Sequence, residues 1–259
     1  MMYRFARERT DDSAYASGHV LHSAPGRTGF PVRLATELFQ RCAAHLKARD
    51  VRPPFTLYDP CCGAGQLLTT IGLLHRDAIG EIIGSDIDDA AVELARRNLA
   101  LLSPAGLSAR VAELDDLHRR FDRVSHAAAA EDARRLLAGM ATASDDIPVS
   151  VFTADITRPG ALAGRIAVGH IDMVITDVPD GNRSAWSTNA DEAVPSVSPI
   201  GRMLETVQPV LAPGAVVAVV CGKDQRATHP AFRRVERWQL GRRRIELQEL
   251  IPGGDAAIR

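Results

Sequence analysis

Short apolar runs alternate with amphipathic segments over most of the chain. The runs are rich in Val, Ile, Leu and aromatic residues, which favour strands, and the segments between them repeat their apolar positions at helical spacing. This alternation predicts an α/β protein with a doubly wound, mostly parallel sheet and right-handed crossovers. The predicted strands cover residues 55–60, 81–86, 149–155, 171–176 and 215–221, and the predicted helices cover residues 31–46, 65–76, 89–102 and 198–211.

Two arginine-bearing runs near the end of the chain, residues 232–240 and 242–251, meet at Gly241. A glycine between two β-type runs predicts an antiparallel hairpin, which would complete a seven-stranded sheet. We expect a single domain over residues 1–259, with an N-terminal extension and helix in residues 1–50 that is irregular up to residue 30. The alanine-rich, charged residues 103–148 indicate a helical insertion.

Composition is that of an ordinary globular protein, with 46% hydrophobic and 24% charged residues and a formal net charge of −1. No apolar run is long enough to span a bilayer, and residues 1–15 lack the apolar core of a signal peptide. We therefore expect a cytoplasmic protein with no membrane association. The four cysteines form no Cys-x-x-Cys pair and the eight histidines show no ligand spacing, so neither a metal site nor a disulfide framework is expected.

Positive charge is concentrated near the end of the chain. From Arg226 to Arg244 there are seven arginines and one acidic residue, Glu236. This basic strip is either a face that contacts phosphates or a solvated sheet edge whose charges prevent aggregation. Near the other end, His19 and His22 are either ordinary surface residues or RNA contacts.

The stretch LYDPCCGAGQLL, residues 57–68, has the most specific pattern in the chain. Asp59 ends a predicted strand, Gly63 and Gly65 form a turn, and a helix follows at once. Glycines at this edge of an open α/β sheet let the backbone approach a ligand closely. A dinucleotide-binding turn would have a third glycine where Leu68 stands, and Asp59 would repel a pyrophosphate.

Two further carboxylates, Asp86 and Asp155, follow the next two predicted strands. Asp86 stands where such folds place an acid that accepts ribose hydroxyls. Each acid taken alone could be a helix cap or a turn residue. Together with Asp59, three acids at consecutive strand ends favour a ligand with a ribose and an amine but no phosphate, which describes S-adenosylmethionine.

The motif Asp-Pro-Cys-Cys-Gly-Ala-Gly, residues 59–65, resembles the cofactor motif of class I methyltransferases that modify nucleic-acid bases, and the order of elements extends this similarity over residues 30–250. More narrowly, the chain resembles the avilamycin-resistance 23S rRNA (guanine) methyltransferases. The resemblance implies a Rossmann-like fold and methyl transfer from S-adenosylmethionine to a guanine of 23S rRNA. It also implies a set of cofactor-binding residues: Asp59, Cys61, Gly63 and Gly65 around the methionine part, Asp86 at the ribose, Ile87 beside the adenine and Asp155 at its amino group.

The stretch TDVPDG, residues 176–181, follows the fourth predicted strand at the same sheet edge. Related amino-group methyltransferases have Asn/Asp-Pro-Pro-Tyr in this loop, and its aromatic ring stacks on the target base. Here that position holds Asp180, and Trp186 either replaces the aromatic ring or is an ordinary loop tryptophan. Guanine N1 must lose a proton as it attacks, so a second carboxylate favours N1 over the exocyclic N2 as the target. We expect Asp177 or Asp180 to be the base.

Loops that leave a catalytic site often contact the substrate. The expected substrate-binding residues are Pro179, Asn182, Arg183 and Trp186, together with Arg27 near the start of the chain. The favoured function is a monomeric, metal-independent methyltransferase that acts on 23S rRNA or the large ribosomal subunit and confers resistance to an antibiotic. Two alternatives remain: a methyltransferase for DNA amines or a small molecule, and a ribosome-binding protein without turnover.

Overall fold

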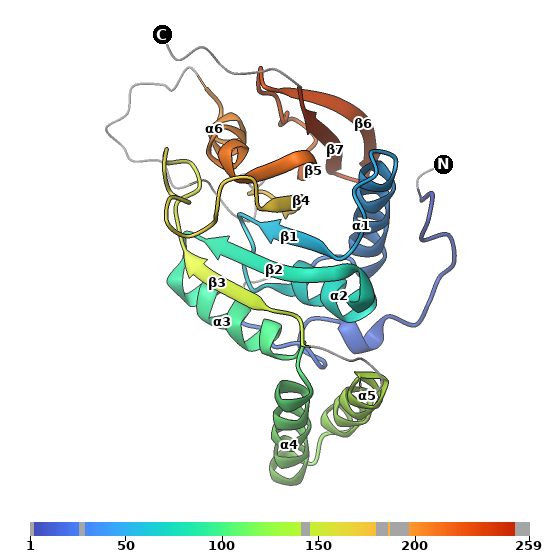
Figure 1. Ribbon diagram of the computed structural model, residues 1–259. Helices are drawn as coiled ribbons and strands as arrows, with labels where there is room; N and C mark the ends of the chain where they lie inside the picture. The colour runs from blue at the N-terminus through green and yellow to red at the C-terminus, as the bar shows by residue number, and fades with distance from the viewer. Residues whose placement is uncertain (1–2, 26–28, 141–145, 180–185, 187–196, 252–259) are drawn as a thin grey trace.

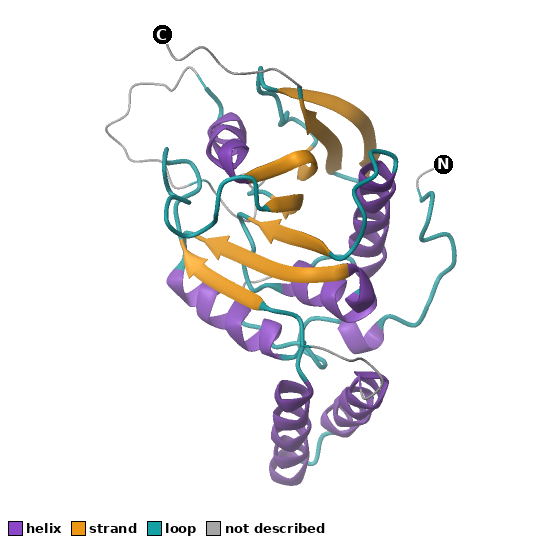
Figure 2. Ribbon diagram, in the orientation of Figure 1, coloured by secondary structure: helices purple, strands orange, loops and turns teal. Residues whose placement is uncertain are grey.

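A seven-stranded sheet forms the centre of the protein (Figures 1 and 2). The computed structural model describes residues 3–25, 29–140, 146–179, 186 and 197–251. The strand order is β3-β2-β1-β4-β5-β7-β6, in which β1 to β5 are parallel and the last two strands are antiparallel to their neighbours. The strands are β1 (Phe55–Asp59), β2 (Ile79–Asp86), β3 (Val149–Thr153), β4 (Ile171–Asp177), β5 (Leu211–Gly222), β6 (Phe232–Leu240) and β7 (Arg243–Leu250).

The predicted sheet class and the terminal hairpin are confirmed. Gly241 has φ of +59°, a conformation that glycine adopts without strain, and it directly follows β6 at the hairpin turn. Strand β5 begins earlier than expected, at Leu211, because a register shift against β4 accommodates Pro213 and Gly214. Proline has no N–H for the ladder, so it is tolerated at such an irregularity.

Helices cover both faces of the sheet. One face packs against α1 (Val32–Lys47), α2 (Gln66–Leu74) and α3 (Asp89–Ala100). The other face packs against α6 (Pro199–Val207) and the connector between β3 and β4. The described part of the chain also contains the two helices of the insertion and three short 3₁₀ helices, which are Ser13–Tyr15, Arg76–Ala78 and Gln208–Val210. The central strands are buried from both sides, which explains their nearly continuous apolar sequences.

The helical insertion is a pair of packed helices, α4 (Pro104–Phe121) and α5 (Val124–Met140), that projects from the sheet (Figure 1). The hydroxyl of Ser103 caps α4 by accepting the N–H of Gly106 at 3.1 Å. The pair buries Leu107 and Leu114 against Val20 and Leu21 of the N-terminal extension. The insertion therefore packs on a segment far away in sequence.

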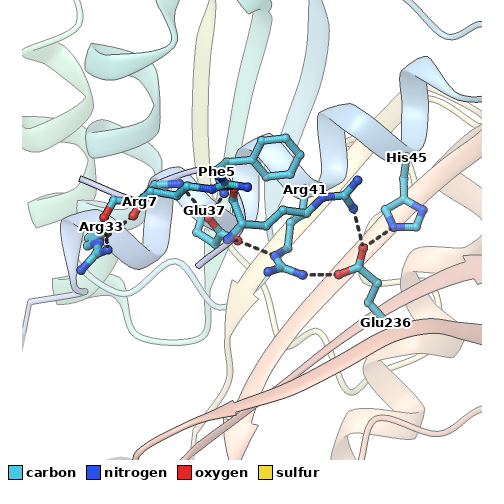
Figure 3. Close-up of polar contacts among 9 residues, drawn as sticks. Phe5, Arg7, Arg33, Glu37, Arg41, His45 and Glu236 are labelled. Carbon is cyan, nitrogen blue, oxygen red and sulfur yellow. Dashed lines mark hydrogen bonds and ion pairs between the residues drawn. The ribbon is translucent and has the colours of Figure 1, made fainter. Parts of the chain in front are cut away.

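The N-terminal extension is irregular but firmly held to α1 (Figure 3). The buried carboxylate of Glu37 accepts the backbone N–H groups of Arg4, Phe5 and Ala6 at 2.6, 2.8 and 2.9 Å. It also accepts Nε of Arg41 at 2.6 Å. Sequence patterns gave no sign of this anchor, because it depends on backbone donors about thirty residues away.

The same network continues to the hairpin. Arg41 also pairs with Glu236 of β6, whose carboxylate lies 2.9 Å from Nε2 of His45 (Figure 3). His45 and Arg49 both contact Glu249 of β7. Through these residues α1 joins the N-terminal extension to the antiparallel end of the sheet. No helix in the described part of the chain has the length and apolarity needed to span a membrane.

Candidate cofactor and substrate site

The glycine turn between β1 and α2 opens one side of the site. Gly63 has φ of +53°, and a Cβ built there would meet no atom within 4 Å, so its backbone faces open space. Gly65, with φ of +71°, is different, because its missing Cβ would lie 3.0 Å from the Cβ of Ala95 in α3. Gly63 therefore leaves room for a ligand, whereas Gly65 allows α3 to pack against the turn.

Asp86 lies beside this turn, at the end of β2. One carboxylate oxygen accepts the N–H of Gly63 at 2.8 Å, and the other accepts the N–H of Asp88 at 3.1 Å. Asp88 in turn caps α3, as its position in the sequence predicts. Ile87, between the two acids, is 45% exposed and offers an apolar surface next to the Asp86 carboxylate.

Asp59 is the buried charge of the site. It is 2% exposed and accepts the N–H of Cys61 at 3.0 Å. Burial raises the pKa of its carboxyl to about 7, and repulsion from Asp86 and Asp177 acts in the same direction. Burial also raises the pKa of the Cys61 and Cys62 thiols well above the usual value, which keeps both neutral. Neither thiol is activated as a nucleophile.

A small cavity of about 50 Å³ connects several predicted site residues. It is lined by Cys61, Asp86, Ile87, Asp155, Pro179 and Trp186, together with Pro60, Ala154, Ile156 and Thr157. Four predicted cofactor residues thus share one cavity with two residues predicted to bind substrate.

Trp186 lies in this cavity, beside Ile87 and Asp155. Its indole Nε1 is buried and has no hydrogen-bond partner among the described residues, although a buried indole N–H usually has one. The sequence predicts that Trp186 binds substrate, and in the structure it shares the cavity with residues predicted to bind the cofactor and with Pro179. Asp155 already accepts bonds from Thr157 and Arg158, as a turn residue would.

Asp177 ends β4 next to the cavity, and its side chain is 36% exposed. One carboxylate oxygen lies 3.7 Å from a guanidinium nitrogen of Arg243 on β7. After it, the N–H of Val178 bonds to the carbonyl of Val220 at 2.9 Å, and the side chain of Gln225 donates to the carbonyl of Pro179 at 2.8 Å. The start of the loop is therefore fixed to the end of β5.

Four predicted residues, Asp180, Asn182, Arg183 and Arg27, lie outside the described residues. Conversely, sequence reasoning did not identify Arg243 or Gln225 as parts of the site. Arg243 reaches the site through the pairing of β7 with β5, and Gln225 reaches it from the turn after β5. Neither contact carries a local sequence signal. Only the excess of arginine in this region pointed towards Arg243.

The basic strip is partly neutralised by acids of β7. Arg234 lies 3.6 Å from Glu246, and Arg233 lies 3.4 Å from Glu249. Because β6 is an edge strand, these ion pairs support the explanation that the basic strip is a charged sheet edge. The strip was defined as residues 226–244, so it did not include Glu246 and Glu249, which follow Arg244 in the sequence.

The two N-terminal histidines contact the body of the protein. His22 is 9% exposed, and burial together with Arg110 and Arg97 lowers its pKa to about 4. His22 is therefore buried, and the explanation that it is an ordinary surface residue is wrong. Nε2 of His19 lies 2.7 Å from Asp132 of α5. Among the described residues, no group of three or more His, Cys, Asp or Glu side chains is arranged to hold a metal ion.

Comparison with known proteins gives consistent matches over almost the whole chain. The family described as rRNA methyltransferase AviRa matches residues 1–243. The 23S rRNA (guanine(2535)-N(1))-methyltransferase of Streptomyces viridochromogenes is 44% identical over 241 residues, which is 93% of each chain. Two solved structures of rRNA methyltransferase AviRa from this organism, at 1.5 and 2.4 Å, superpose with TM-scores of 0.82 and 0.81 at 43% identity, covering 95% of this chain and 96% of theirs.

Proposed function

This chain belongs to the AviRa family of rRNA methyltransferases, and from that premise we propose that it methylates N1 of a guanine in 23S rRNA. The observation that carries the proposal is the edge where β1, β2 and β4 end, which gathers Asp59, Asp86 and Asp177 around the glycine turn. The relative from Streptomyces viridochromogenes acts on guanine N1. The expected consequence is resistance to an antibiotic of the avilamycin type.

The donor set of this edge fits S-adenosylmethionine. Asp86 would accept the ribose hydroxyls, Ile87 and Trp186 would flank the adenine, and Asp155 would accept its amino group. Asp59 and the open backbone at Gly63 would face the cationic methionine part, with Cys61 beside them. When bound, this cofactor supplies the methyl group as an electrophile.

The protein must supply a group that accepts the N1 proton, and it must hold the target guanine in position. Methylation would form a new N–C bond at N1, and the electron pair of the broken C–S bond would stay on the sulfur of the methyl donor. The N1 proton passes to a carboxylate, either Asp177 or Asp180, and from there to water. Most of the remaining rate gain comes from holding the two reactants in line. Pro179, Asn182, Arg183 and Arg27 are the proposed RNA contacts, and N2 remains the alternative target.

We further propose that residues 1–259 act as one domain and as a monomer in the cytoplasm, with naked 23S rRNA or the large subunit as substrate and no metal requirement. The insertion of residues 103–148 is then part of that domain. The alternatives of a DNA or small-molecule methyltransferase and of an inactive binding protein have no specific observation in their favour.

The test uses 23S rRNA and large subunits incubated with labelled S-adenosylmethionine, followed by primer extension. N1-methylguanine blocks Watson–Crick pairing, so reverse transcriptase should stop at one site. A short RNA that carries inosine at that site provides the control, because inosine has N1 but lacks the N2 amine. Methylation of the inosine RNA supports N1, and a product identified as N2-methylguanine would overturn the assignment. Label on small molecules alone would overturn the proposed function itself.

A further inference from the structure

We infer that Arg243 of the C-terminal hairpin is a catalytic residue that binds O6 of the target guanine and, together with Asp177, selects guanine over adenine. The inference rests on the proposed function, since it names the group that recognises the reacting base. Arg243 comes from the antiparallel end of the sheet, outside the parallel strands that supply the three acids.

The strand pattern explains how Arg243 reaches the site. On β4, Met173 and Ile175 face the side covered by α1, so Asp177 continues the same face. On β7, Ile245 and Leu247 face that side too, which places Arg243 on the same face as Asp177. Both residues stand at the edge where the parallel strands end.

Strand β5 separates β4 from β7, and the β5 residue paired with Arg243 is Gly222. Because Gly222 has no side chain, the Arg243 side chain can cross β5 towards Asp177. The guanidinium also lies over the ring of Phe30, 5.7 Å from its centroid, which supports its orientation.

The Asp177–Arg243 pair is loose enough to admit a base. Their closest approach of 3.7 Å is longer than a hydrogen bond, and a guanidinium has five N–H donors. The Arg243 side chain is 31% exposed, so part of it remains accessible from solvent. Donors are therefore available to a substrate that comes alongside Asp177.

The chemistry of the pair matches the edge of guanine. That edge presents O6 as an acceptor and N1–H and N2–H as donors, whereas adenine presents a donor amine and an acceptor N1. A guanidinium beside a carboxylate offers a donor for O6 and an acceptor for the N–H groups. Adenine in the same orientation would place its donor amine against the guanidinium and its acceptor N1 against the carboxylate, a mismatch that selects against adenine.

Arg243 also has a role in the reaction. When N1 gives its proton to a carboxylate, the negative charge that remains is shared between N1 and O6. A fixed guanidinium at O6 stabilises this charge before and during attack on the methyl group, as donors at developing oxyanions do in other enzymes. Replacement of a residue with this role should lower kcat more than it changes KM.

The experiment compares Arg243→Met and Arg243→Lys with Arg242→Met. Arg242 is the neighbouring exposed arginine in the hairpin turn, so its replacement removes the same charge one residue away. Steady-state methylation of 23S rRNA gives kcat and KM, the pH profile of kcat is recorded, and affinity for S-adenosylhomocysteine is measured without RNA. Thermal unfolding checks the fold of each variant.

We expect Arg243→Met to lower kcat about 100-fold or more with little change in KM or in S-adenosylhomocysteine affinity. Its kcat should continue to rise at higher pH than in the wild type, because guanine must then ionise without the cation. Arg243→Lys should recover part of the loss, and Arg242→Met should change only KM and its salt dependence.

Equal effects of Arg243→Met and Arg242→Met would assign Arg243 to general RNA attraction and overturn the inference. So would a kcat within twofold of wild type in Arg243→Met, or an unshifted pH profile. If Arg243→Met unfolds, Arg243→Lys decides by the same kcat and pH criteria. A wild-type protein that forms no N1-methylguanine would instead refute the proposed function, which separates the two failures.

Discussion

Replacement of Asp59 by Asn should make the ligand-free protein more stable at pH 8 while it weakens cofactor binding. The Asp59 carboxyl is 2% exposed, and its pKa is raised from 3.8 to about 7. A shift of roughly three units corresponds to about 4 kcal/mol lost from the unfolding free energy when the group is ionised in the folded state. Asn keeps an oxygen for the N–H of Cys61 but carries no charge.

The sign of this effect depends on pH in a defined way. Between pH 4 and 7 the folded protein holds a proton on Asp59 that the unfolded chain has released, so stability falls as pH rises through this window. The full cost is present above pH 7, and at pH 5 it falls below about 2 kcal/mol. Since Asn also needs polar partners, we expect a gain of about 2–4 kcal/mol at pH 8, or roughly 5–10 °C in Tm.

Urea and thermal unfolding of the ligand-free protein at pH 5 and pH 8 measure this difference. Asp224→Asn is the matched control, because Asp224 is exposed and the substitution removes the same charge. Calorimetry with S-adenosylhomocysteine should show at least a 10-fold weaker Kd for Asp59→Asn, since a bond to the ligand ammonium is lost. Wild-type affinity should itself weaken below pH 7 as Asp59 takes up a proton.

Three outcomes would each refute one step of this reasoning. Equal or lower stability of Asp59→Asn at pH 8 would mean that the buried carboxylate is not a cost to the fold. A stability difference that is the same at pH 5 and pH 8 would mean that ionisation is not its cause. An unchanged affinity for S-adenosylhomocysteine would remove Asp59 from the proposed cofactor contacts.

Three further predictions concern the anchor, the cavity and the loop. Glu37→Ala should lower the unfolding free energy by about 2–4 kcal/mol in urea, because three backbone N–H groups lose their acceptor, whereas the exposed Glu8→Ala should have little effect. In Trp238→Phe, Trp186 is the single remaining tryptophan, and its fluorescence should change when S-adenosylhomocysteine is added without RNA. A fluorescence change with RNA alone would instead support Trp186 as a substrate-binding residue. Asp180→Asn should lower kcat at least 100-fold if Asp180 is the base, and full activity would exclude that role.

The parts of the fold that depend on local chemistry could be predicted from the sequence. Apolar runs marked the strands, and Asp88 marked the start of α3 because a cap acts on its own helix. Asp59, Asp86 and Asp155 could be assigned to one site without knowing the strand order, since parallel strands of one sheet end at the same edge. The strand order itself and the anchor at Glu37 depend on pairing between distant segments, which local patterns do not record.

Within the site, the same difference separates the two glycines. Both stand in one motif and both have positive φ, yet only Gly63 faces open space. Gly65 is needed because Ala95, thirty residues later in α3, packs against it. A motif can therefore show where a turn lies without showing which glycine leaves open space and which one allows helix packing.

The basic strip leads to a more general point about charge in this fold. Along the sequence the strip shows only as an excess of arginines over acids, but strand pairing gives its members different partners. On β6, Arg233 and Arg234 face the acids of β7, where their charge is locally compensated. Arg243 begins β7 beside Gly222, and the pairing directs it across β5 to Asp177 instead. The hairpin thus supplies a cation to a sheet edge that otherwise concentrates carboxylates. In the proposed reaction, a cation at that position would stabilise the negative charge on the guanine oxygen.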